Sequence, residues 1–140
     1  MNLLTFLGTG KYRSTTYDHE GVRVTTAYFS VAAAQFVAAK HVYVGLTEEA
    51  RKHDNWSHLQ RELEMAGCSV GPIDIPSGRS EAELWTVFNV LADAVADESD
   101  LALDVTHGFR SLPMLAVVLS AYLKAIGGPK ISRILYGAYD

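Results

Sequence analysis

The chain has 140 residues, 49% of them hydrophobic and 20% charged, and its formal net charge is −4. These values predict one globular domain over residues 1–140, exclude a disordered chain, and argue against broad electrostatic contact with duplex nucleic acid. A single cysteine excludes an internal disulfide, and no apolar stretch reaches the roughly 18 residues of a membrane span. Because no basic segment precedes the apolar N-terminus, we expect a cytoplasmic domain without membrane contact.

The first third of the sequence predicts a strand, a hairpin and a helix. Residues 2–8, NLLTFLG, form an apolar run ended by glycine, as in a strand buried on both faces. The Thr- and Tyr-rich stretch that follows surrounds DHEG at 18–21, which favours a hairpin or an extended excursion. Residues 27–39 then have helical spacing and many small side chains, so this helix should pack closely on a sheet.

Two further helices have recognisable N-caps. Thr47 precedes two glutamates and should cap a helix that ends near Gly67. Ser80 and Glu83 form a capping-box pattern at the start of the helix expected over 80–97. These caps predict one helix before the strand expected at 69–75 and one helix after it in the chain.

Four strands and a last helix complete the pattern. Strands are expected at 41–46, 69–75, 100–105 and 130–139, and a nearly all-apolar helix at 111–126. The second of these strands contains a proline, which places it at a sheet edge or at a bulge.

This alternation of strands and helices predicts an α/β fold of the Rossmann-like class. Its sheet should be mainly parallel, with helices on both faces and a hairpin inserted after the first strand. In such folds ligands bind beyond the carboxyl ends of the strands, where the strand order reverses. Two segments at such ends carry unusual polar groups: GTGKY at 8–12 and THGFRS at 106–111.

The GTGKY segment is similar to a phosphate loop but fails both standard patterns. A P-loop needs Ser or Thr after its lysine, where this chain has Tyr12, and it needs an upstream glycine that is absent. A dinucleotide fingerprint needs glycine where Arg13 stands. The two glycines still let backbone amides approach an anion, although a plain glycine-rich turn would have the same sequence.

The segment after the fourth sheet strand carries more directional groups than a turn requires. Gly108 permits a sharp turn, and the following helix directs unpaired N–H groups toward the crevice. Arg110 and Ser111 are donors suited to phosphate oxygens. Thr106 and His107 can bond to the edges of a base or ribose. The segment therefore predicts an anion and nucleotide site.

Asp104 lies at the strand end, where it should orient His107 or loop amides rather than meet an anionic ligand. A purely structural interpretation has Asp104 and Thr106 capping the turn and Arg110 on a solvated face. A Ser–His–Asp hydrolase built on Ser111 is disfavoured, because three triad members on one short turn rarely reach the required geometry.

Metal and cofactor signals are weak elsewhere in the chain. His53 and His58 are five residues apart, which does not match the spacing of a helical metal pair. Cys68 suits a small buried core residue. We therefore expect neither a metal nor a cofactor.

The run LDVTHGFRSLP at 103–113 resembles the D-x-T-H-G signature of CRISPR-associated Rossmann-fold (CARF) sensor domains of type III systems. The resemblance extends over nearly the whole chain. It includes FLGTGKYRSTTY at 6–17, EAELWTVFNVLADAV at 81–95 and ILYGAYD at 134–140.

The resemblance implies a homodimer that binds a cyclic oligoadenylate second messenger, a tetra- or hexa-adenylate, across its two-fold axis in antiviral defence. Binding would activate a C-terminal effector domain, which these 140 residues do not include. The implied ligand contacts are Gly8, Thr9, Gly10, Lys11 and Tyr12 in the first loop and Thr106, His107, Gly108, Phe109, Arg110 and Ser111 in the second, with Ser77 and Gly78 as a weaker rim.

Two alternatives stay open at this point. The same pocket could also cleave its ligand, as a metal-independent ring nuclease in which Lys11, Thr106 and His107 assist. The domain could instead bind an ordinary nucleotide or act only as a scaffold.

Overall fold

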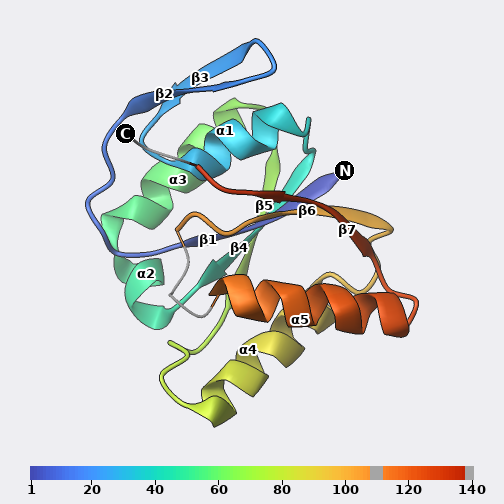
Figure 1. Cartoon of the computed structure of the whole chain (residues 1–140). Coiled ribbons are helices and arrows are strands. Elements are labelled where there is room, and N and C mark those ends of the chain that lie inside the picture. Colours follow the sequence, from blue (N-terminus) through green and yellow to red (C-terminus); the bar gives the residue numbers. More distant parts are fainter. Residues whose placement is uncertain (108–111, 138–140) are drawn as a thin grey trace.

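The computed structural model describes residues 1–107 and 112–137, and it has a five-stranded parallel sheet between two layers of helices (Figure 1). The strands are β1 (Asn2–Leu7), β4 (His41–Leu46), β5 (Ser69–Asp74), β6 (Asp100–Asp104) and β7 (Lys130–Leu135). Their order is β5-β4-β1-β6-β7, and every neighbouring pair is parallel. The order reverses between β1 and β6, so the predicted Rossmann-like fold is confirmed, as is the edge position of the proline-containing strand.

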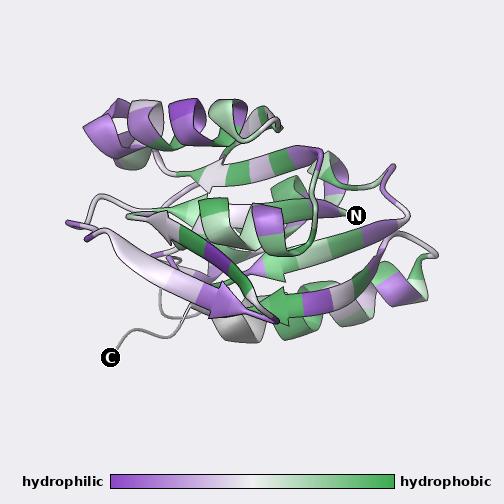
Figure 2. Ribbon diagram, turned by 90° about the horizontal axis from the view of Figure 1, so that it is seen from above, coloured by the Kyte–Doolittle hydropathy of each residue, from purple (hydrophilic) through white to green (hydrophobic). Residues whose placement is uncertain are grey.

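Each face of the sheet has its own hydrophobic core. The helices are α1 (Phe29–Phe36), α2 (Glu48–Lys52) and α3 (Asp54–Met65) on one face, and α4 (Glu81–Ala94) and α5 (Leu112–Ala125) on the other. Leu3 and Leu4 are both fully buried but belong to different cores, because successive side chains of a strand point to opposite faces. Figure 2 shows the sheet strands as mostly hydrophobic. No helix within the described ranges is long and apolar enough to cross a bilayer.

The inserted excursion after β1 is a β-hairpin, as the DHEG motif predicts. Its antiparallel strands are β2 (Thr15–His19) and β3 (Val22–Thr26). Glu20 and Gly21 form the two-residue turn with φ values of 51° and 82°, and such a turn matches the twist of the flanking strands. Tyr17 packs edge-on against Phe29 at 4.9 Å, so the hairpin lies against the start of α1. The hairpin thereby covers the N-terminal end of α1.

The helix predicted to follow Thr47 is in fact two helices. Thr47 does cap α2, since its Oγ1 accepts a hydrogen bond from the Ala50 amide at 3.2 Å. His53 then has extended backbone angles and caps α3, with its Nδ1 accepting from the Asn55 amide at 3.1 Å. The second helix ends before Gly67, whose φ of 90° explains the predicted stop. No glycine or proline marks the break at His53, so the sequence pattern concealed it.

A helix and the last strand are also shorter than predicted. The helix expected over 27–39 extends only from Phe29 to Phe36, and its N-cap, Tyr28, makes no side-chain cap. The last strand ends at Leu135 rather than at 139, and residues 138–140 lie outside the described part of the chain.

Gly45 in β4 provides a test of the packing between the sheet and its core. A Cβ at this position would lie 2.7 Å from Cδ1 of the Phe6 ring, which is buried and has little room to move. We therefore expect Gly45→Ala to destabilise the fold by about 1–3 kcal/mol in urea unfolding. Gly10→Ala is the control, because its nearest neighbour would be Cε1 of Tyr12 at 3.6 Å. Equal losses in the two variants would contradict this account.

Candidate functional site

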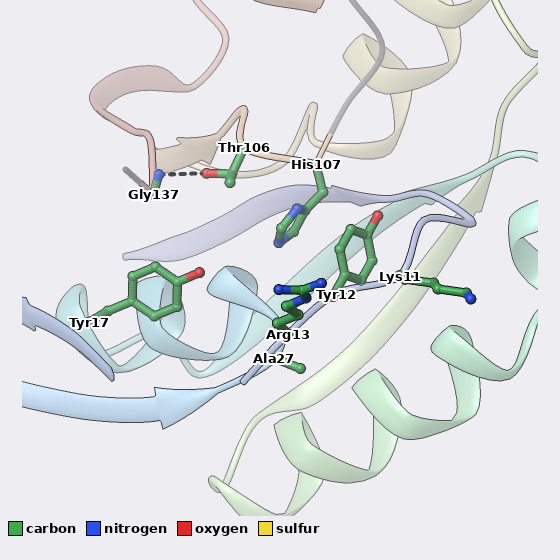
Figure 3. Close-up of a pocket in the computed structure, with 8 residues that line it drawn as sticks. All are labelled: Lys11, Tyr12, Arg13, Tyr17, Ala27, Thr106, His107 and Gly137. Carbon is green, nitrogen blue, oxygen red and sulfur yellow. Dashed lines mark hydrogen bonds between the residues drawn. The ribbon is translucent and has the colours of Figure 1, made fainter. Parts of the chain in front are cut away.

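A pocket of about 340 Å³ lies at the carboxyl ends of β1 and β6, where the strand order reverses (Figure 3). Its wall comes from four parts of the chain: the loop after β1, the hairpin, the turn after β6 and the end of β7. The lining residues are Lys11, Tyr12, Arg13, Tyr17, Ala27, Thr106, His107 and Gly137. The position is the one that the fold class predicts for a ligand.

Hydrogen bonds within the loop after β1, and from Asn55 of α3, fix the conformation of this loop. The Gly8 amide donates to the Tyr12 hydroxyl at 2.9 Å. Nδ2 of Asn55 donates to the carbonyl oxygens of Gly8 and Gly10 at 3.2 and 2.9 Å, and its Oδ1 accepts from the Tyr28 hydroxyl at 3.3 Å. Burial raises the pKa of Tyr12, although the hydrogen bond from Gly8 partly opposes the shift. The Gly8 amide therefore bonds to Tyr12 and does not face the pocket as a free anion donor.

Tyr12 and His107 form an aromatic pair at the centre of the site, with ring centroids 4.3 Å apart. Nε2 of His107 accepts a hydrogen bond from the backbone amide of Phe29, the first residue of α1, at 3.2 Å. Burial lowers the pKa of His107, and the nearby Asp104 carboxylate only partly offsets this effect. Because Nε2 uses its lone pair, the neutral ring carries its proton on Nδ1.

Asp104 is fully buried and accepts hydrogen bonds from three elements. Its Oδ2 accepts from Oγ1 of Thr5 at 2.7 Å and from Oγ of Ser30 at 3.3 Å. Its Oδ1 accepts from the Thr106 amide at 2.9 Å. The carboxylate thus orients a loop amide, as the sequence suggested, and it connects β1, α1 and the turn after β6. The His107 ring instead accepts a hydrogen bond from the Phe29 amide, so Asp104 and His107 do not form part of a Ser–His–Asp triad.

Thr106 joins the turn after β6 to the end of β7. Its Oγ1 accepts from the Gly137 amide at 2.8 Å, the contact drawn in Figure 3. A Cβ at Gly137 would lie 2.6 Å from the Phe29 ring, so only glycine fits this approach. This side of the pocket is therefore built from backbone.

Lys11 and Arg13 supply the positive charge of the pocket. Both side chains are exposed, and neither forms an ion pair with any residue that the structure describes. In a chain with a formal net charge of −4, two such cations at one site favour an anionic ligand.

A second pocket, of about 390 Å³, lies over the carboxyl ends of β1, β4 and β5. Gly8, Thr9 and Ser77 line it, and His107 lines both pockets. Ser77 and the Gly78 amide both donate to Oε1 of Glu83, at 3.2 Å each. These contacts place the predicted rim residues against α4.

The capping box predicted at the start of α4 is half formed. The Glu83 amide donates to Oγ of Ser80 at 3.2 Å, as expected. The Glu83 side chain instead accepts from the loop before the helix. The local pattern identified the cap but not the partner of the carboxylate.

The structure distributes the predicted site residues over both pockets. Lys11, Tyr12 and Thr106 line the first, Gly8, Thr9 and Ser77 the second, and His107 both, whereas Gly10 and Gly78 line neither. Gly108, Phe109, Arg110 and Ser111 lie outside the described residues. Within residues 1–107 and 112–137 there is no cluster of three or more His, Cys, Asp or Glu side chains that could hold a metal ion.

Sequence reasoning missed several residues of the site. Arg13 directly follows the predicted loop, so its position was a usable signal. Tyr17 and Ala27 reach the pocket only because the hairpin folds back, and Gly137 because β7 lies beside β6. Asn55 holds the loop from a distant helix and has no local signature.

The buried, neutral His107 predicts a pH dependence of folding stability. Its pKa in the folded protein lies below its ordinary value of about 6.5, so below that pH the unfolded chain binds protons more readily. His107 therefore lowers the free energy of unfolding as the pH falls from 7.5 to 5.5, a change measurable by urea titration. His107→Asn should reduce this dependence, whereas the exposed control His58→Asn should keep it. Equal pH dependence in wild type and His107→Asn would contradict the assigned neutral state.

Comparison with known proteins agrees with this architecture. Residues 2–139 match the family described as "CRISPR system endoribonuclease Csx1, CARF domain". The chain is also 32% identical over 132 residues to "CRISPR-associated protein MJ1674" of Methanocaldococcus jannaschii. That alignment covers 81% of this chain and 21% of the relative, so the chain spans about a fifth of that protein's length. The chain belongs to the CARF domain family of CRISPR-associated proteins.

Proposed function

We propose that this domain is a sensor that binds a cyclic oligoadenylate, a ring of four or six adenylates, in type III CRISPR defence. The observation that carries the proposal is the pocket at the reversal of strand order, which combines the cations Lys11 and Arg13 with the Tyr12–His107 pair. Membership of the CARF family supports the same class of ligand.

The chemistry of the pocket suits a nucleotide ring. Phosphates need cations and N–H donors, which Lys11 and Arg13 supply in the first pocket. Arg110, which lies outside the described residues, is the further phosphate contact that the sequence predicts. Adenine faces stack favourably on aromatic side chains such as those of Tyr12 and His107. A compact cationic pocket serves this ligand without a broadly basic surface.

The hydrogen bonding of His107 suits a donor rather than a general base. A general base needs a free lone pair, but Nε2 of His107 already accepts the Phe29 amide. The remaining nitrogen, Nδ1, carries the proton and can donate only. His107 thus serves as a hydrogen-bond donor and a stacking surface rather than as a general base, and incubation with the ligand distinguishes a sensor from a ring nuclease.

The helical face formed by α4 and α5 is the proposed homodimer surface. Trp85, Val117, Val118, Tyr122 and Ile126 are between 43% and 66% exposed on it. The rings of Trp85, Phe88 and Tyr122 form a continuous series of edge contacts, 5.8 and 5.0 Å between centroids. Since α5 follows the turn after β6, pairing through this helix would bring two such turns together, so that one two-fold symmetric ring contacts both.

We further propose that binding is relayed to an effector domain attached to this domain in the longer protein. The relative from M. jannaschii is long enough to hold further domains, since the alignment covers 21% of it. The route for the relay begins at Thr106, whose hydroxyl bonds to the segment after β7.

Calorimetry with cyclic tetra- and hexa-adenylate tests the binding site. We expect one ring per dimer, and about tenfold weaker binding in Lys11→Ala and in Arg110→Ala, because each loses a charged contact to phosphate. Lys52→Ala is the matched control, since its ammonium pairs with Glu48 at 2.9 Å on α2 and lines neither pocket.

Normal binding by both pocket variants would place the site elsewhere. Chromatography after long incubation with each ring should recover intact ligand. Linear products would instead show that the domain is a ring nuclease. Tight binding of AMP or ATP without binding of either ring would favour an ordinary nucleotide site.

Light scattering tests the dimer surface. Val117→Asp combined with Tyr122→Asp should shift the protein from dimer to monomer, because two charges would be buried in an apolar interface. Met65→Asp is the control, as Met65 is 81% exposed at the end of α3, on the opposite face of the sheet. A dimer that survives the double substitution would exclude this face.

A further inference from the structure

The second pocket, over the carboxyl ends of β1, β4 and β5, has its own set of lining residues. It has about 390 Å³ and adjoins the first pocket through His107, which lines both. Its floor contains Phe6, Leu7 and Ile75, each at most 7% exposed. An apolar floor of this kind suits the face of a planar base rather than a phosphate.

Two charged side chains of opposite sign stand on the rim of this pocket. Glu49 and Arg79 both line it, and neither makes a hydrogen bond or an ion pair with any residue in the described part of the chain. Two polar neighbours already form hydrogen bonds: Thr47 accepts from the Ala50 amide, and Ser77 donates to Glu83. The two charged side chains therefore offer a carboxylate acceptor and a cation to a ligand.

The neighbouring glutamate, Glu48, differs from Glu49 because its carboxylate already has a partner. Glu48 lies in the same first turn of α2, but its Oε1 accepts from Nζ of Lys52 at 2.9 Å, and it does not line the pocket. Both carboxylates interact favourably with the helix terminus, so that interaction does not distinguish them. Of these two glutamates, Glu49 is the one that lines the second pocket.

We infer that the second pocket takes an adenine base of the ring and that Glu49 recognises its 6-amino group. The inference rests on the proposed function, because the ligand class comes from there. The adenine amino group donates hydrogen bonds and the Glu49 carboxylate accepts them, while a carbonyl at the same position would be repelled. Arg79 offsets the repulsion between this carboxylate and the phosphates of the ring. The first pocket would then supply the cations for phosphate and the aromatic faces of Tyr12 and His107, and the second would supply the contact that selects adenine.

The test compares the binding of each adenylate ring with that of its purine counterpart, in the wild-type protein and in variants at Glu49 and Glu48. Calorimetry would use cyclic tetra- and hexa-adenylate and, for each, the ring in which purine replaces every adenine, so that only the amino groups are missing. For the wild-type protein we expect the purine ring to bind at least about tenfold more weakly, the usual effect of losing hydrogen bonds to a charged group. In Glu49→Ala the two rings should bind within about twofold of each other.

Two further variants make the comparison specific. Glu48→Ala removes the same charge from the same helix turn and should keep the full preference for adenine. Glu49→Gln keeps an acceptor oxygen and should keep part of it. Since loss of a negative charge strengthens binding of both rings alike, the ratio of the two dissociation constants isolates the amino contact.

The outcomes separate this inference from the proposed function. If the wild-type protein binds neither adenine ring, the proposed function is wrong and this inference fails with it. If the wild type binds an adenine ring but Glu49→Ala keeps the wild-type preference over purine, the proposed function stands and the assignment of Glu49 is overturned. An equal loss of preference in Glu48→Ala would also overturn it.

Discussion

The buried carboxylate of Asp104 is the contact on which the rest of the site depends. It sits at the end of β6 with no exposure to solvent, and it bonds to Thr5 of β1, Ser30 of α1 and the Thr106 amide. A buried charge is costly unless its hydrogen bonds are satisfied, and here three donors from three elements satisfy it. One charge therefore fixes the two central strands, a helix and the turn that lines the pocket relative to one another.

The position of α1 in turn determines the chemistry of His107. With Ser30 bonded to Asp104, the preceding residue, Phe29, presents its amide to Nε2 of the imidazole. Burial lowers the pKa of the ring, the Phe29 amide occupies Nε2, and the ring packs against Tyr12 at a tilt. A residue type often associated with proton transfer becomes a fixed part of the pocket wall.

Local patterns predicted most of the fold and only part of the site. Apolar runs located the strands, and the DHEG motif located the hairpin, because each signal lies within a few consecutive residues. The helix break at His53 escaped because its cap is an unusual histidine contact rather than a glycine or proline. The Glu83 carboxylate was misassigned because it bonds to the loop before the helix rather than back to the cap residue. Asn55 was missed because its partners, Gly8 and Gly10, lie far from it in the sequence. Long-range contacts of this kind leave no periodic trace in the sequence.

Gly137 belongs to a part of the first pocket whose sequence cannot vary, whereas other parts of the lining can. Phe29 leaves no space for a side chain at 137, and the backbone there is bonded to Thr106. The hairpin ends in an exposed turn at Glu20 and Gly21 and contributes side chains such as Tyr17 to the pocket. Under the proposed function, adaptation of this domain to rings of different size would proceed by changes in the hairpin, while the backbone at Gly137 stays fixed.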